Sequence, residues 1–396
     1  MRNMAFLFLA CICLPAFAAE AVTVAQLEKT LAAAHGKSDA STAQRLSELE
    51  LTERLSSAKL AYWNAKLRGD KAQQALIALA DASAFLDPPA AEIPLSAAPD
   101  PAAQQKMISM AAEYVSETMP RLPNLLATRE TRQFQNHFAA SRTEEANINV
   151  DPRFHFVGSS SATVLYRDGQ EVLDHSLATD AKEAGKPPQS NGLVTWGEFG
   201  HLLGTVMGDA LQGKLTWSHW ELGAAGPMAV FRYAVPLVKS HYEVKQCCAL
   251  FDDGMSGFNR IPGSFDQVPA YHGEIAIDPV TGAVLRLVLQ TELQPSDPIV
   301  RADVVVEYGP VEIGGKTYIC PVKSISISKS PIREGNGFWY SSSTATGLEK
   351  TAINDYAFDN YHLFRGDARI LTGNTIEPDK NAPASSPASG VQSTHP

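Results

Sequence analysis

The stretch that decides the fold runs from Tyr271 to Leu293 and reads YHGEIAIDPVTGAVLRLVLQTEL. Apolar and polar side chains alternate up to Asp278, and they alternate again from Leu285. A period of two is typical of a strand with one buried face. The turn between the two halves, residues 279–282, is too short to join parallel strands, so the two strands must run antiparallel.

The flanking sequence extends this sheet. Residues 301–313 and 316–328 are two further runs of strand character around Gly314-Gly315. Residues 163–173 make a shorter pair around Asp168-Gly169, which tolerate the positive φ of a tight hairpin turn. We therefore predict an α+β fold whose main part is a curved antiparallel meander, similar to a half-barrel, with one apolar and one mixed face.

Helices are predicted at two places in this sheet domain. One covers residues 104–119 and is stopped by Pro120. The other lies near 196–207, because Thr195 and Glu198 have the spacing of a capping box and apolar residues follow at helical spacing. Its three glycines cost about 1 kcal/mol each relative to alanine. We expect close packing on the apolar face of the sheet to compensate.

The N-terminal part is helical in character. Residues 20–86 contain no proline and are rich in Ala, Leu, Glu, Gln and Lys. Apolar residues spaced by three and four predict helices over 51–65 and 72–86, which a short glycine turn joins into a hairpin, with a shorter helix near 23–34 before them.

Proline divides the chain into domains. Residues 87–103 hold five prolines and predict a semi-rigid linker. The sheet domain then spans 104–370. Residues 377–396 are mostly Pro, Ser, Ala and Asn, which predicts a disordered tail.

The first 19 residues, MRNMAFLFLACICLPAFAA, have the pattern of a secretory signal peptide. The alternative is a lipoprotein signal in which Cys11 carries the lipid. No later stretch reaches the roughly 18 apolar residues of a spanning helix. We expect an exported protein, periplasmic or extracellular, without a transmembrane span in the mature chain. Its 43 acidic and 33 basic residues, a formal charge of -10, argue against a nucleic-acid partner.

Three cysteines remain after the leader: Cys247, Cys248 and Cys320. Thiols of exported chains tend to pair, and adjacent residues of a strand point to opposite faces. We predict a disulfide from Cys248, or failing that Cys247, to Cys320. The alternatives are free buried thiols, a vicinal redox disulfide between Cys247 and Cys248, and a three-cysteine metal site, which adjacent cysteines suit poorly.

No spacing typical of a catalytic, metal or cofactor site occurs. The segment Gly314 to Thr317 lacks the earlier glycine of a phosphate-binding loop, and Gly254 to Gly257 lacks the spacing of a nucleophile elbow. His241 with Glu243, and His272 with Glu274, share predicted strand faces and are candidate acid–base pairs. The plainer interpretation is a solvated polar sheet face, so we assign no catalytic residue, metal or cofactor.

Large apolar side chains gather around the glycine-bearing helix and the strands after it. They are candidates for the lining of an apolar ligand cavity, and ordinary core packing is the alternative. The set is Trp196, Phe199, Leu203, Trp217, Trp220, Phe231 and Tyr233.

Several segments resemble a family of exported bacterial proteins that has no assigned activity. They are LSELELTERLSSAKL (46–60), ALADASAFLDPPAAEIP (78–94), LPNLLATRET (122–131), YHGEIAIDPVTGAVLRL (271–287), VVVEYGPVEIGGKTYICPVKSISIS (304–328) and NDYAFDNYHLFRG (354–366). The segment GEIAIDPVTGAVLRL also resembles the meanders of periplasmic lipoprotein-carrier and sigma-regulator half-barrels, which implies a sheet wrapped around a helix and an apolar cavity.

The resulting functional hypothesis is a non-enzymatic envelope protein that binds or carries an apolar small molecule or lipid, or acts as a scaffold. The alternative is a hydrolase whose site assembles only in three dimensions. The sequence indicates no oligomeric state.

Overall fold

The fold belongs to the α+β class, as predicted. The computed structural model describes residues 19–34, 36–140, 148–174, 193, 195, 197–224, 226–249, 263–334 and 344–364. They belong to one compact unit, residues 1–364. The predicted signal peptide, apart from Ala19, and the predicted tail lie outside the described residues, as does Trp196.

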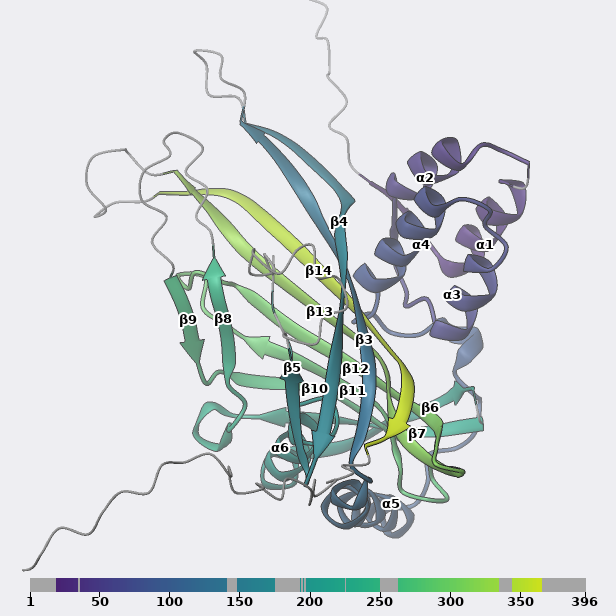
Figure 1. Cartoon of the computed structure of the whole chain (residues 1–396), viewed down its shortest axis with the longest axis vertical. Helices are drawn as coiled ribbons and strands as arrows, with labels where there is room; N and C mark the ends of the chain where they lie inside the picture. The colour runs from purple at the N-terminus through teal and green to yellow at the C-terminus, as the bar shows by residue number, and fades with distance from the viewer. Residues whose placement is uncertain are drawn as a thin grey trace, which may run out of the picture. The chain divides into compact units, whose positions relative to one another are not determined.

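One antiparallel sheet of ten strands dominates the fold, and it does not close into a barrel (Figure 1). Its strands follow the order β5-β4-β3-β14-β13-β12-β11-β10-β7-β6. Their bounds are β3 Leu125–Ala140, β4 Ile148–Arg167, β5 Gln170–Asp174, β6 Lys214–Gly223, β7 Gly226–Val235, β10 Ala270–Ile277, β11 Val284–Glu292, β12 Arg301–Ile313, β13 Lys316–Glu334 and β14 Thr344–Leu363.

The predicted hairpins are confirmed. Strands β10 and β11 pair antiparallel, as do β12 and β13. Strands β4 and β5 meet at a turn where Asp168 and Gly169 have φ of 52° and 80°. Positive φ at both central positions is the geometry of a type I′ turn, which matches the twist of the flanking strands.

Successive residues of the central strands face two different cores. Leu287 and Val304 belong to a core that includes helices α5 (Pro101–Glu113) and α6 (His201–Gln212). Their neighbours Val288 and Val305 belong to a second core that includes helix α4 (Asp70–Ala82). We call these two surfaces of the sheet the α6 face and the α4 face. Both faces of the central strands are therefore buried.

Helix α6 packs on the sheet as predicted, but it begins later than the sequence indicates. The predicted capping box at Thr195 is wrong: its hydroxyl donates to the Glu198 carboxylate, and the helix starts at His201. Gly197 and Gly200 have φ of 86° and 149°. These conformations are incompatible with a helical turn, so the helix cannot start before them.

Four helices cover the α4 face: α1 (Val24–Ala33), α2 (Asp39–Ser47), α3 (Ser57–Asn64) and α4. The helix predicted over 51–65 is only partly present, because Leu51 ends a short strand, β2 (Leu49–Leu51). This strand pairs in parallel with β1 (Glu20–Val22). Helix α2 was absent from the prediction. The predicted linker leads into α5, which Asp100 caps through the backbone N–H of Ala103.

A separate two-stranded sheet consists of β8 (Val244–Ala249) and β9 (Gly263–Gln267). Within the part of the chain that the structure describes, no helix has the length and apolar character to cross a membrane.

Candidate functional site

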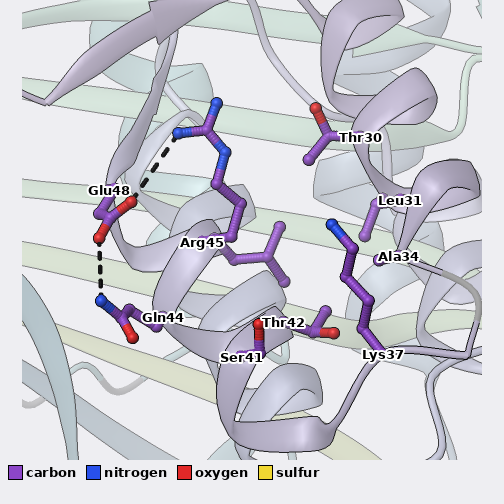
Figure 2. Close-up of a pocket in the computed structure, with 10 residues that line it drawn as sticks. Thr30, Leu31, Ala34, Lys37, Ser41, Thr42, Gln44, Arg45 and Glu48 are labelled. Carbon is purple, nitrogen blue, oxygen red and sulfur yellow. Dashed lines mark hydrogen bonds and ion pairs between the residues drawn. The ribbon is translucent and has the colours of Figure 1, made fainter.

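A hollow of about 300 Å³ opens between helices α1 and α2 (Figure 2). Pockets of about 300 to 1,000 Å³ are of the size that binds small molecules. Its apolar part consists of Leu31, Ala34 and Leu46, and the rest of the lining is polar: Thr30, Lys37, Ser41, Thr42, Gln44, Arg45 and Glu48.

The two cations of this hollow differ in their partners. Arg45 Nη2 lies 2.6 Å from Glu20 Oε2, and its Nη1 lies 3.8 Å from Glu48 Oε2. The Lys37 side chain extends toward the space between Arg45 and Leu31 (Figure 2). Among the described residues, no acidic side chain forms an ion pair with its ammonium group. Glu20 and Glu48 thus balance the charge of Arg45, whereas the Lys37 ammonium can form an ion pair with a ligand.

Local sequence defines the start of α2 beside the hollow. Ser38 caps α2, its Oγ accepting from the backbone N–H of Ser41 at 3.3 Å. The next residue, Asp39, is engaged by helix α4, because its Oδ1 accepts from the backbone N–H of Ala72 at 2.8 Å. The side-chain acceptors of Ser38 and Asp39 at the start of α2 are thus already engaged, and Lys37 comes directly before this capped start.

A row of alternating charges crosses the α4 face. Opposed residues of neighbouring strands form it: Arg232 opposite Glu274, Arg286 opposite Glu307, Glu307 opposite Lys323, and Asp355 opposite Arg132. Ion pairs of 3.0 Å (Arg232–Glu274), 3.4 Å (Lys323–Asp355) and 3.1 Å (Arg132–Asp355) connect its members. Cross-strand pairs of opposite charge stabilise a sheet. We call this set the charged row.

The N-terminal helices and the segments between them meet the charged row with complementary groups. Ser57 donates to Glu307 at 2.6 Å, and Asp81 pairs with Lys323 at 2.7 Å. Arg54 and Arg286 both contact Glu221 Oε1 at 2.6 Å. The side chains of Arg54, Arg286 and Glu221 are buried.

Burial and charge oppose each other in this contact. Burial by itself raises the pKa of Glu221, but hydrogen bonds and the charges of the two arginines outweigh it and hold that pKa well below its usual range. Burial and the nearby Asp355 carboxylate raise the pKa of Asp81 to about 7. Burial lowers the pKa of Lys323, but the charges of Asp81 and Asp355 raise it overall, so Lys323 keeps its proton. The buried ions of this contact are thus Glu221 with its two arginines, and Lys323. The small hollow beside them, of about 10 Å³, has no room for a ligand.

A buried acid pair lies on the α6 face. Glu171 Oε2 accepts from the backbone N–H groups of Gly197 at 3.0 Å and Phe199 at 3.4 Å. Burial and the neighbouring Glu198 raise the pKa of Glu171 to about 8. One oxygen of each carboxyl group is buried without a hydrogen-bond partner among the described residues. Glu171 therefore holds its proton at neutral pH and ties the start of α6 to strand β5.

Asp209 orients a histidine at the end of α6. Its Oδ1 lies 2.6 Å from His241 Nδ1, and its Oδ2 accepts from the His241 backbone N–H and the Tyr271 hydroxyl, both at 2.8 Å. The Asp209 side chain is buried, and that of His241 is 70% exposed. A buried carboxylate bound to one ring nitrogen is the geometry that orients a catalytic base.

The six described side chains predicted to line an apolar cavity all belong to the core on the α6 face. Phe199, Leu203, Phe231 and Tyr233 are fully buried or nearly so. Trp217 packs edge-on against Trp220 and Phe231, with ring centroids 5.0 and 5.4 Å apart. Phe199 packs instead against Tyr166 and Phe358. The two hollows described above are lined by other residues.

The predicted disulfide to Cys320 is wrong for this structure. Cys320 is a free, buried thiol in β13, opposite Gly309 of β12. Cys247 and Cys248 belong to β8, which pairs with β9 outside the ten-stranded sheet, and their side chains lie outside the described residues. Strand β8 lies outside the ten-stranded sheet that holds β13, and the expected pairing rested on compartment chemistry, which carries no information about this arrangement.

The predicted histidine–glutamate pairs do not assemble. His272 contacts Glu292 at 3.3 Å, while Glu274 pairs with Arg232 and Arg286. His241 contacts Asp209, and Glu243 contacts Lys245. Within the described part of the chain, no three His, Cys, Asp or Glu side chains gather as metal ligands would.

The sequence reasoning missed the hollow, the charged row, and the roles of Glu171 and Asp209. A signal for the row was present: Arg286 is the one charged residue in the run from Val284 to Leu289, and the strand continues apolar on both sides. Comparison with family models, with curated proteins and with solved structures found no match for this chain.

Proposed function

We propose that the chain is an exported, non-enzymatic binding protein whose ligand, a small polar carboxylate, occupies the hollow between α1 and α2. The observation that carries the proposal is the Lys37 ammonium, which reaches into this hollow without an acidic partner among the described residues. The leader sequence supports export, since a signal peptide directs a chain out of the cytoplasm.

The polarity of the hollow favours a carboxylate over a lipid. The hydroxyl groups of Thr30 and Thr42 already donate to the carbonyl oxygens of Gln26 and Ser38, whereas the Ser41 hydroxyl can donate to a ligand. Leu31 and Leu46 supply only a small apolar floor. A carboxylate at Lys37 gains a charge-assisted hydrogen bond.

The test is calorimetric titration of the mature protein with three probes: succinate, N-acetylglutamate and inorganic phosphate. We expect at least one of the two carboxylates to bind. Lys37→Gln should lower the affinity for it about tenfold, since a charged hydrogen bond contributes about 1.5–3 kcal/mol. Lys29→Gln, an exposed position of α1 outside the hollow, is the matched control. Binding of phosphate alone, or equal affinity in both variants, contradicts the proposal.

A second candidate function, hydrolysis, is favoured by one observation, the contact between Asp209 and His241. A solvent-exposed imidazole with an oriented partner is suited to general-base catalysis. Its test is turnover of p-nitrophenyl acetate by wild-type protein, His241→Ala and Asp209→Asn. Loss of turnover in both variants supports the hydrolase, and equal rates in all three proteins remove it.

A further inference from the structure

Two carboxylates compete for one guanidinium group beside the hollow between α1 and α2. Arg45 contacts Glu20 at 2.6 Å and Glu48 at 3.8 Å, so a single positive charge faces two negative charges and Glu20 has the shorter contact. The other contact of Glu48 is uncharged, since it accepts from the Gln44 amide nitrogen at 3.3 Å. A carboxylate offers about four acceptor sites. Glu48, whose side chain is 42% exposed, can therefore accept from a further cation.

A cation of strand β4, Arg153, also lies in the field of Glu48, but it has its own partner. Hydrogen bonds to Asp151 raise the pKa of Arg153, and the charge of Glu48 contributes least to this shift. Arg153 Nε and Nη2 bind the two oxygens of the Asp151 carboxylate at 2.7 and 2.8 Å. Asp151 therefore balances Arg153, and the surplus negative charge stays at Glu48.

The available cation and the surplus carboxylate of the hollow flank opposite ends of one helix. Lys37 comes two residues before the first residue of α2, and Glu48 directly follows its last residue. Helix α2 has nine residues, which is a length of roughly 14 Å. Figure 2 shows Lys37 and Glu48 on opposite sides of the hollow, with Arg45 between them. The hollow thus has a positive end and a negative end that are well separated.

We propose that the ligand of this hollow is a zwitterion whose carboxylate pairs with Lys37 and whose ammonium group pairs with Glu48. This inference rests on the proposed binding function and specifies the class of its ligand. An ammonium group has three donors, and Glu48 and the Gln44 amide oxygen can accept from it. A dicarboxylate places a like charge against Glu48, and a diamine places one against Lys37, which charge complementarity disfavours.

The separation of the two ends selects among zwitterions. In an α-amino acid, both charged groups are attached to the same carbon, so one molecule cannot contact both ends of the hollow. A zwitterion with several atoms between its charges can span from Lys37 to Glu48. Methylene groups between the charges match the apolar part of the lining, which consists of Leu31, Ala34 and Leu46.

The test is calorimetric titration of the mature protein with three ligands that share a chain of six carbons: 6-aminohexanoate, hexanoate and adipate. We expect 6-aminohexanoate to bind about tenfold more tightly than the other two, because it alone offers an ammonium group to Glu48. Glycine, whose two charges share one carbon, should bind at least about tenfold more weakly than 6-aminohexanoate. Glu48→Gln should remove the advantage of 6-aminohexanoate and leave the affinity for hexanoate unchanged. Glu50→Gln is the matched control, at an exposed position of β2 outside the hollow.

Failure of the zwitterion and failure of the carboxylate site give different results. If no carboxylate binds at all, the proposed function fails and the zwitterion fails with it. Equal affinities for the three six-carbon ligands, or tightest binding of adipate, keep a carboxylate site and overturn the zwitterion. An advantage of 6-aminohexanoate that persists in Glu48→Gln overturns it as well, and glycine that binds as tightly as 6-aminohexanoate overturns the separation of the two charges. Circular dichroism checks that each variant is folded.

Discussion

Asp81 of helix α4 and Lys323 of strand β13 form an ion pair of 2.7 Å, with side-chain exposures of 0% and 16%. The pair joins the N-terminal helices to the sheet. We predict that Lys323→Met destabilises the protein by about 3–5 kcal/mol, because it leaves the carboxyl group of Asp81 buried without its cation. Denaturant unfolding of wild type and variant measures the difference.

Lys329→Met provides the matched control on the same strand. Lys329 pairs with Glu349 at 3.5 Å, and its side chain is 35% exposed. Exposed pairs contribute about 0–1 kcal/mol, so this variant should unfold close to wild type. Equal effects of the two substitutions would contradict the role assigned to the buried pair.

The acid pair on the α6 face predicts a pH dependence of stability. Burial and Glu198 raise the pKa of Glu171 to about 8, from 4.5 in an unfolded chain. The folded protein therefore binds a proton that the unfolded chain has released, and the free energy of unfolding falls as the pH rises through this window. Each unit of pKa difference corresponds to about 1.4 kcal/mol.

Glu171→Gln tests this assignment. Its amide oxygen can still accept the hydrogen bonds from Gly197 and Phe199, but the group no longer titrates. We expect a flatter dependence of unfolding free energy on pH from 4.5 to about 8 than in wild type. A residual slope of the same sign should remain, since the pKa of Asp81 is also raised. Glu130→Gln, half exposed on β3, is the control, and unchanged curves for Glu171→Gln would refute the assignment.

The parts of the fold predicted from sequence are those fixed by local signals. Asp168-Gly169 and Gly314-Gly315 specify tight turns between runs of strand character, and both hairpins are present. The parts that were missed depend on contacts between distant residues. Leu51 has helical spacing to Leu55, yet it lies in a strand because it pairs with Val22. Local propensity is overridden there by tertiary pairing.

The pairing of charges across the charged row was beyond prediction for the same reason. Arg132 and Asp355 are opposed only because β3 and β14 are neighbours, and nothing local in either strand indicates that pairing. The predicted disulfide is the reverse case, a contact that was expected and is absent. It inferred proximity of Cys248 and Cys320 from compartment chemistry alone, which carries no information about strand order.

Gly273 is required by the close approach of a neighbouring strand. A Cβ at this position of β10 would lie 1.9 Å from the Val288 carbonyl oxygen and 2.9 Å from the Tyr233 hydroxyl. That hydroxyl donates to the same oxygen at 2.7 Å. Gly273→Ala should destabilise by at least about 1–3 kcal/mol, because either the strand pairing or the buried hydrogen bond must give way.

The control is Gly158→Ala on β4, where a Cβ would meet nothing within 4 Å. Thermal unfolding should show a clear decrease for Gly273→Ala and little change for Gly158→Ala. Equal unfolding temperatures of Gly273→Ala and Gly158→Ala would show that Val288 does not approach this strand as closely as described.

Cys320 provides the last prediction, which also decides the question of the disulfide. The thiol is buried in the core, and burial raises its pKa to about 12. Only the thiolate reacts quickly with iodoacetamide, so the native protein should leave Cys320 unmodified at neutral pH. After unfolding in guanidinium chloride without any reductant, the peptide that contains Cys320 should be fully alkylated in mass spectra. A disulfide to Cys247 or Cys248 would instead protect it until reductant is added, and the pairing of β8 with β9 away from β13 makes that outcome the unexpected one.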